Sequence, residues 1–287
     1  MATIIGGIAT SHIPAIGNAI AKHKFEDPYW KSFFDSYEPV RAWLDEQKPD
    51  VAVVVYNDHG LNFFVDTMPT FAIGAALEYE NLDEGWGLST VPPFPGDVEL
   101  SWHLIESIQS EGFDLTTCQR MAVDHGFVVP MQLLFPDRQP WPVRTVPLHV
   151  NTVQHPLATP ARCYSLGQAL GRALRAYPED VRVVVLGTGG LSHQLDGQRA
   201  GFINKPFDLY CIEKIVDDPN ELTRLTVHEI VRLAGTQGPE LLLWLIMRGA
   251  LSEKVIRRWA DYHVPISNTG AGLLLLEPLE AVLADPS

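Results

Sequence analysis

The sequence predicts an α/β fold in which a mixed central sheet is flanked by helices. Short runs rich in Val, Ile and Leu recur along the chain, and segments with the 3.6-residue period of helices lie between several of them. The runs are almost continuously hydrophobic rather than alternating, which is typical of a mostly parallel or mixed sheet buried on both faces. Because no Ser/Gly linker, charge run or repeat divides the chain, we expect a single domain over residues 1–287.

The predicted strands are short, rich in β-branched residues and bounded by turn residues. The first, TIIGGIA, is punctuated by glycine, and VAVVVY and VRVVVLG follow the same pattern further along. The six predicted strands are Thr3–Ala9, Val51–Tyr56, Thr70–Ala75, Arg144–Val150, Val181–Gly187 and Ala271–Leu276.

Four segments have the apolar spacing of helices that pack on a sheet. Pro239 suits the first turn of the last one, and Gly238 suits its cap. The four predicted helices are Val98–Ser110, Arg162–Ala176, Lys205–Val216 and Pro239–Ala250. The segment Asn81–Gly96 is rich in Gly and Pro and is expected to be irregular, either as a loop that borders a site or as a plain surface excursion.

Composition is that of an ordinary globular protein, with 46% hydrophobic and 20% charged residues among 287. No apolar run approaches the roughly 20 residues of a membrane span, and the longest, Leu241–Met247, is expected in a buried helix. No basic leader precedes an apolar segment in residues 1–20, so we expect a cytoplasmic location.

The net charge of -14 argues against a nucleic-acid partner, because phosphate binding requires clustered Lys and Arg. A small anionic substrate is compatible with this charge, since a few local groups can hold it. The three cysteines, Cys118, Cys163 and Cys211, have no CxxC spacing, so we expect reduced thiols rather than a disulfide framework or a zinc-thiolate site.

Three histidines lie shortly after the ends of predicted strands: His12, His59 and His193. Ligands of open α/β sheets bind at the carboxyl edge of the strands, so these side chains are predicted to converge on one pocket. His125, in AVDHG, follows a short polar turn and could reach the same side. The alternative for each is a hydrogen-bonded loop residue, because a chain with ten histidines places some at strand ends by chance.

Glu240 supplies the carboxylate that a metal site would need. It lies in the first turn of a very apolar helix, where an acid either offsets the helix dipole or is carried inward and requires a cation. Two neutral imidazoles and one carboxylate form the facial triad that binds ferrous iron and leaves coordination positions open. The same ligands suit a catalytic zinc ion, and the spacing of these residues does not separate the two metals.

Two further motifs lack the spacing that their functions require. Gly187–Gly190, GTGG after a strand, hints at phosphate binding but lacks the spacing of GxGxxG and of the P-loop. Ser192 beside His193 suggests a hydrolase but lacks the GxSxG elbow.

Eight motifs, taken together and in order, resemble the type III (LigB-like) extradiol ring-cleavage dioxygenase family. They are TSHIPAIG, VYNDH, PTFAIG, DEGWG, VDHG, GTGGLSHQLDGQRAGFINKPFD, ELLLWLIMRGAL and YHVPISNTGAG, and the resemblance runs from about residue 3 to residue 276. It implies a LigB-like fold and a catalytic subunit that uses Fe(II) and O2.

The resemblance also implies a role for each matched residue. His12, His59 and Glu240 would be the iron ligands. His193 would be the acid/base histidine and His125 a second active-site histidine near the substrate hydroxyls. The implied substrate-binding residues are Asn57 and, for the substrate carboxylate, Ser267 and Asn268.

The implied substrate is a catecholic aromatic acid, in the first place protocatechuate, opened at the 4,5 bond to give 4-carboxy-2-hydroxymuconate semialdehyde. LSHQLDGQ and DHGF depart slightly from the protocatechuate pattern, so gallate and 3-O-methylgallate remain alternatives. A third alternative is a non-catalytic metal-binding scaffold of the same fold. Gallate-type relatives usually carry a further fused domain, and we expect this chain to be too short to hold one. We therefore expect a separate small α subunit, in an α2β2 assembly.

Overall fold

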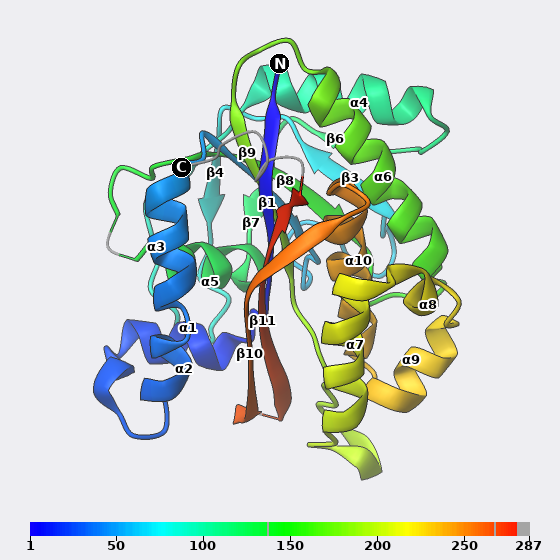
Figure 1. Cartoon of the computed structure of the whole chain (residues 1–287). Coiled ribbons are helices and arrows are strands. Elements are labelled where there is room, and N and C mark those ends of the chain that lie inside the picture. The colour runs from blue at the N-terminus through cyan, green and yellow to red at the C-terminus, as the bar shows by residue number, and fades with distance from the viewer. Residues whose placement is uncertain (137, 267, 280–287) are drawn as a thin grey trace.

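The structure is a computed structural model that describes residues 1–136, 138–266 and 268–279. It contains an eight-stranded mixed sheet with the order β10-β11-β1-β9-β2-β8-β3-β6 (Figure 1). These strands are β1 (Thr3–Thr10), β2 (Val51–Tyr56), β3 (Phe71–Gly74), β6 (Thr116–Cys118), β8 (Arg144–Val150), β9 (Arg182–Thr188), β10 (Val255–Ile266) and β11 (Thr269–Pro278). The predicted α/β fold with a mixed sheet is therefore confirmed.

The four central strands, β1, β9, β2 and β8, run parallel to one another. Strand β11 pairs antiparallel with β1 and forms a hairpin with β10, while β3 pairs antiparallel with β8. The carboxyl ends of the central strands therefore share one edge of the sheet. A small second sheet has the order β5-β4-β7, formed by β4 (Glu78–Asn81), β5 (Phe94–Pro95) and β7 (Ala122–Val123).

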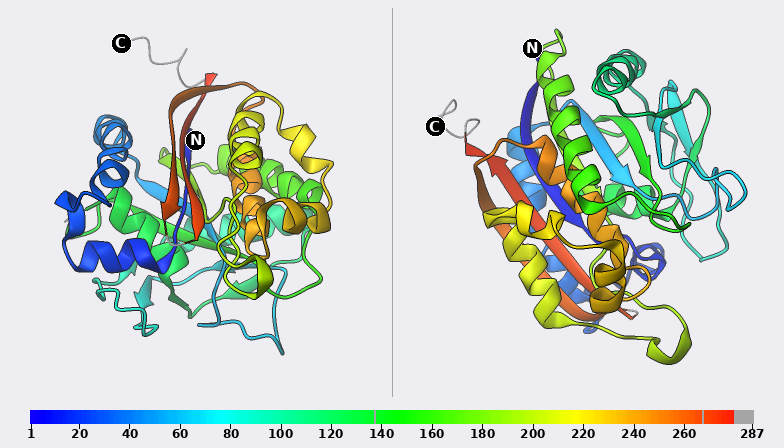
Figure 2. Two further views of the ribbon diagram at one scale, coloured as in Figure 1. Left: turned by 90° about the horizontal axis from the view of Figure 1, so that it is seen from below. Right: turned by 90° about the vertical axis from the view of Figure 1, so that its right-hand side faces the viewer.

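Both faces of the sheet are covered by helices, as the uninterrupted apolar strands predict. Along β2, Val51, Val53 and Val55 enter one hydrophobic cluster, whereas Ala52, Val54 and Tyr56 enter the other. Figures 1 and 2 show the two helical layers on either side of the sheet. One layer holds α1 (Pro14–Ala21), α2 (Lys31–Asp35), α3 (Glu38–Gln47) and α5 (His125–Leu134); the other holds α4 (Val98–Ser110), α6 (Pro160–Ala176), α7 (Lys205–Asp217), α8 (Pro219–Thr223), α9 (Val227–Ala234) and α10 (Leu241–Ala250).

Helix α10 is buried on every side, between the sheet and α6. The two helices approach closely at Gly167 and Gly249, where an added Cβ would collide with backbone carbonyls of the facing helix. A short 3-10 turn, η3 (Gly238–Glu240), precedes α10, so the predicted helix begins two residues later than expected. This turn directs Glu240 toward the carboxyl edge of the sheet.

The segment between β4 and β5 is irregular, as expected. The Asn81 side chain joins the two ends of this segment: it donates a hydrogen bond to the Val91 carbonyl at 2.6 Å and accepts one from the Val91 amide at 3.0 Å.

The three cysteines are free thiols, as predicted. Within the described part of the chain, no helix combines the length and apolar character needed to cross a bilayer.

Candidate metal centre

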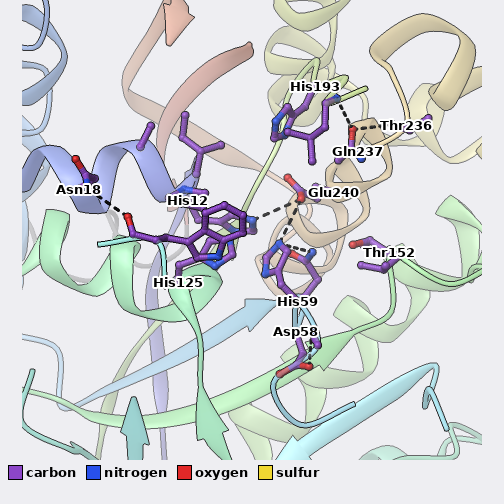
Figure 3. A pocket seen from close by; sticks show the side chains of 18 of the residues that line it. His12, Asn18, Asp58, His59, His125, Thr152, His193, Thr236, Gln237 and Glu240 are labelled. Atoms are coloured by element: carbon purple, nitrogen blue, oxygen red, sulfur yellow. Dashed lines mark hydrogen bonds and ion pairs between the residues drawn. The ribbon is translucent and has the colours of Figure 1, made fainter. Parts of the chain in front are cut away.

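Six of the predicted site residues lie around one cavity of about 1190 Å³ at the carboxyl edge of the sheet (Figure 3). They come from the segments after β1, β2 and β9, from the start of α5 and from η3. The six are His12, Asn57, His59, His125, His193 and Glu240. The predicted convergence of strand-end histidines is therefore observed.

His12 follows β1 and is almost fully buried, with 2% of its surface exposed. Pro14 begins α1 directly afterwards, so the chain turns sharply at this point. The Nδ1 atom of His12 lies 3.0 Å from the Thr188 hydroxyl at the end of β9. This hydrogen bond orients the ring and leaves Nε2 directed at Glu240, 3.5 Å from its Oε1 atom.

His59 is held by the carboxylate of Asp124. Both the backbone amide and Nδ1 of His59 contact Asp124 Oδ2, at 2.6 and 3.0 Å. With Nδ1 occupied, Nε2 is the ring nitrogen that faces Glu240 Oε1, at 4.0 Å. Burial opposes the charged form of His59, but Asp124 outweighs it and raises the pKa of His59 to about 9. The surroundings of this ring therefore favour positive charge.

The turn that carries His59 is built by its neighbour Asp58. The Asp58 carboxylate accepts backbone N–H groups from the next turn, and the Asp58 amide donates to His149 Nδ1 at 3.0 Å. The four amides bound by the carboxylate are those of Gly60, Leu61, Asn62 and Phe63. His149 thus supports the site from the end of β8, a role that sequence analysis did not give it.

Glu240 is oriented by the glycine-rich loop after β9. Its Oε2 atom accepts the Gly190 amide at 2.7 Å. Gly189, with φ of 81°, leaves room for this carboxylate, since an added Cβ would lie 2.7 Å from Oε2. The GTGG segment thus binds a carboxylate of the protein itself. Burial would raise the pKa of Glu240, but the facing imidazoles of His12 and His193 outweigh it and hold that pKa well below its usual range.

The arrangement fits a bound divalent cation. The separations of 3.5 and 4.0 Å between Glu240 Oε1 and the two Nε2 atoms are longer than hydrogen bonds. Two ligand atoms that each lie about 2.0–2.2 Å from one ion are at most about 4.4 Å apart, so each of the two separations is short enough for Glu240 to share a cation with that imidazole. The remaining atoms of these three side chains are held by Thr188, Asp124 and Gly190, so the ligand atoms are directed inward. The two buried carboxylates, Glu240 and Asp124, supply the negative charge that a cation would neutralise.

His125 lies within the same cluster. Its ring stacks on His59 with 4.0 Å between centroids, and nitrogens of His12, His59 and His125 all lie within 4.8 Å of one another. The carboxylate of Glu240 pairs with His12 and His59. Two candidate ligand sets therefore share His12 and His59: one adds the carboxylate of Glu240, and the other adds the imidazole of His125.

His193 faces the cavity close to Glu240 (Figure 3). Its backbone amide donates to the Ala234 carbonyl at 2.7 Å, and its carbonyl accepts the Gln237 amide at 3.1 Å, which ties its loop to the start of η3. Burial lowers the pKa of His193, so its imidazole is neutral near pH 7. Among the described residues its Nδ1 atom has no hydrogen-bond partner.

The three predicted substrate-binding residues differ in their placement. Asn57 lines the cavity, and its amide nitrogen lies 3.1 Å from His59 Nε2. Asn268 is exposed, at the turn between β10 and β11, beside Thr269, which pairs with His193. Asn268 does not belong to the described lining of the cavity. Ser267 lies outside the described residues.

An anchor for the His193 loop was also missed by sequence analysis. Asp208, on α7, accepts the Ser192 amide at 3.0 Å and the Ser192 hydroxyl at 2.6 Å, and its other oxygen accepts the Tyr262 hydroxyl at 2.5 Å. The hydroxyl of Ser192 is therefore engaged with Asp208. Burial raises the pKa of Asp208 to about 6 despite these hydrogen bonds.

Asp208 is expected to make stability depend on pH. Because its pKa is about 6 when folded and near 3.8 otherwise, the folded chain holds its proton more tightly, and its contribution to stability falls as pH rises from about 4 to about 6. Asp208→Asn keeps an acceptor for Ser192 and does not titrate. The free energy of unfolding of the wild type, relative to this variant, should decline across that window and level off above it. A constant difference would contradict the assignment.

Two imidazoles and a carboxylate come together at the carboxyl edge of the parallel strands. This arrangement is typical of a candidate metalloenzyme with an α/β fold. The family model described as "Catalytic LigB subunit of aromatic ring-opening dioxygenase" matches residues 6–273 of this chain. The chain therefore belongs to the LigB family, as the motifs indicated.

Curated relatives are consistent with this assignment. The chain is 44% identical over 204 residues to gallate dioxygenase of Pseudomonas putida, covering 71% of this chain and 60% of the relative. It is 34% identical over 187 residues to 2,3-dihydroxyphenylpropionate/2,3-dihydroxicinnamic acid 1,2-dioxygenase of Photorhabdus laumondii, covering 65% and 55% respectively. The matches thus span less than two thirds of these relatives.

A solved structure shares the fold. The crystal structure of an uncharacterized protein from Escherichia coli K12 superposes with a TM-score of 0.56 at 14% identity, covering 96% of this chain and 99% of the other. At this identity the similarity concerns the fold alone.

Proposed function

We propose that this protein is an Fe(II)-dependent extradiol dioxygenase that opens the ring of a catecholic aromatic acid with O2. The observation that carries the proposal is the convergence of His12 Nε2, His59 Nε2 and Glu240 Oε1 at the end of a large cavity. A ligand set of two imidazoles and one carboxylate is the one used for non-haem ferrous iron, and it leaves positions open for substrate and dioxygen.

Gallate is the substrate that we favour over protocatechuate. The relative with 44% identity is named for gallate, which supports the alternative raised from the sequence motifs more than the main prediction.

The mechanism divides the work between the metal and the side chains. When bound, ferrous iron supplies a Lewis acid and a path for electrons between the substrate and O2. His193, kept neutral by burial, accepts a hydroxyl proton from the catechol and later returns it. His125 lies where it can hydrogen-bond a substrate hydroxyl, beside His59. Phe63 and Met68 give the cavity apolar lining, which would limit access of water to the reacting groups once the cavity is covered.

Oxygen uptake after anaerobic loading with Fe(II) tests the function. Gallate, 3-O-methylgallate and protocatechuate are compared at equal concentration, with a monophenolic acid as the control for the need for two adjacent hydroxyls. We expect uptake with gallate to exceed that with protocatechuate by about tenfold or more, a difference of about 1.4 kcal/mol in transition-state binding. Faster turnover of protocatechuate would reverse the substrate assignment. No uptake with any catechol, in the presence of the small subunit, would leave a non-catalytic metal-binding scaffold.

We further propose that a small α subunit covers the mouth of the cavity in an α2β2 assembly. Several apolar side chains line the cavity and are at least half exposed: Phe64, Val65, Trp86, Val153 and Leu195. Exposed apolar side chains gathered at one cavity favour a covering partner. The cavity also exceeds the about 300–1,000 Å³ typical of small-molecule sites, which is consistent with an entrance that a partner narrows.

A further inference from the structure

The irregular segment between β4 and β5 reaches the active site through one side chain, Glu84. Both of its carboxylate oxygens engage His125: Oε2 accepts the His125 backbone amide at 2.7 Å, and Oε1 lies 2.9 Å from His125 Nδ1. The pair is shielded from water, with 13% of the Glu84 side chain and 4% of the His125 side chain exposed. Glu84 is the second residue of the DEGWG motif, and the family resemblance gave no role to this residue.

The loop that carries Glu84 is fixed at other points as well. The two hydrogen bonds between Asn81 and Val91 join the two ends of the loop. Asn18, on α1, donates to the carbonyls of Trp86 and Gly87 at 3.2 and 3.3 Å. These contacts hold the loop against the protein independently of Glu84. The two hydrogen bonds that Glu84 accepts from His125 are therefore not needed to attach the loop.

The chemistry of the pair determines which ring nitrogen of His125 carries the proton. An ionised carboxylate only accepts hydrogen bonds, so Nδ1 of His125 must be the donor to Glu84. In a neutral imidazole the other nitrogen, Nε2, is then an acceptor. A ring with a free Nε2 acceptor can receive a hydrogen bond from a substrate hydroxyl.

A second metal site is the competing explanation, because Glu84, Asp124 and His125 offer ligand atoms within 4.8 Å of one another. These atoms are already engaged by N–H groups. Glu84 accepts two from His125, and Asp124 accepts those of His59 and Gly126. The cluster is thus satisfied by hydrogen bonds, and its geometry favours orientation of the histidines.

We infer that Glu84 is a positioning residue that fixes the orientation and tautomer of His125, so that Nε2 accepts a hydrogen bond from the substrate. The kinetic part of this inference rests on the proposed function. The carboxylate acts through His125 and does not contact the reacting atoms itself.

The kinetic test uses Glu84→Gln, with Glu80→Gln as the matched control. Glu80 lies on β4, is exposed and carries the same charge. For Glu84→Gln we expect kcat to fall about 10- to 100-fold, the usual cost of losing an orienting partner, with little change in KM and normal metal content. Glu80→Gln should retain the wild-type kcat. Adding Glu84→Gln to His125→Ala should cause no further loss. An equal loss in both backgrounds would show that Glu84 acts independently of His125 and would overturn the inference.

A spectroscopic test does not depend on activity. The 15N chemical shifts of the His125 ring in the metal-free protein report which nitrogen is protonated. We expect the Nδ1–H form in the wild type and in Glu80→Gln, and loss of that preference in Glu84→Gln. An Nε2–H form in the wild type would overturn the inference. If the shifts are as expected but no catechol is turned over, the proposed function fails while the assignment of Glu84 stands.

Discussion

Glu240→Ala is expected to remove metal binding and ring cleavage together. The Glu240 Oε1 atom is the only carboxylate oxygen that pairs with both His12 Nε2 and His59 Nε2 among the described ion pairs. Without it, the two imidazoles would have to hold the cation alone. We expect metal affinity to fall by more than about 100-fold, since loss of a partner that merely orients a ligand already costs about 10- to 100-fold. Metal content after dialysis and oxygen uptake with gallate measure the two effects.

The matched control is Glu253→Ala, beyond the other end of α10. Glu253 is exposed, so its removal changes the net charge by the same amount without reaching the cavity. Circular dichroism of Glu240→Ala should resemble that of the wild type, because α10 is held mainly by its buried apolar side chains. Full metal retention by a folded Glu240→Ala protein would show that the carboxylate is not a ligand.

His193→Ala is expected to separate metal binding from turnover. His193 lies in the cavity near Glu240, but its ring is absent from the ion pairs that join His12, His59 and Glu240. The variant should retain metal, and kcat should fall about 100- to 10,000-fold, the range for loss of a general acid or base. Metal analysis and steady-state oxygen uptake test both parts.

His228→Ala serves as the control for His193→Ala, because His228 is an exposed histidine on the neighbouring helix α9. It should keep both metal and turnover. The opposite pattern for His193→Ala, with metal lost, would move His193 into the ligand set. Unchanged turnover would remove it from the proton-transfer step.

The parts of the site that the sequence could predict are those defined by strand ends. His12, His59 and His193 each follow an apolar run, and parallel strands bring such positions to one edge. Glu240 could be predicted because the apolar helix after it has no exposed face on which an acid could lie. In these cases a local pattern and a general rule of sheet topology predict where the residues lie, whereas their roles are implied only by the resemblance to the family.

The supporting residues could not be predicted, because their partners are distant in the sequence. Glu84 and His125 are 41 residues apart, and Asp124 and His59 are 65 apart. Helix α5 was also missed as a helix. Its sequence, HGFVVPMQLL, contains Gly126, Pro130 and β-branched residues that disfavour helix, and the Asp124 cap and burial of most of its side chains compensate.

Strand β10 was missed for a different reason. It lies at the edge of the sheet and carries charged residues, including Arg257, Arg258 and Asp261, so it lacks the continuous apolar run of the central strands. Its long pairing with β11 compensates for this composition. Because β11 then adds to β1, the hairpin brings Thr269 beside His193.

The most direct test of the metal centre is anomalous diffraction at the iron absorption edge from crystals loaded with Fe(II) without oxygen. The proposed centre requires one strong peak about 2 Å from His12 Nε2, His59 Nε2 and Glu240 Oε1. A peak among Glu84, Asp124 and His125 instead, or a first ligand sphere without Glu240, would contradict it.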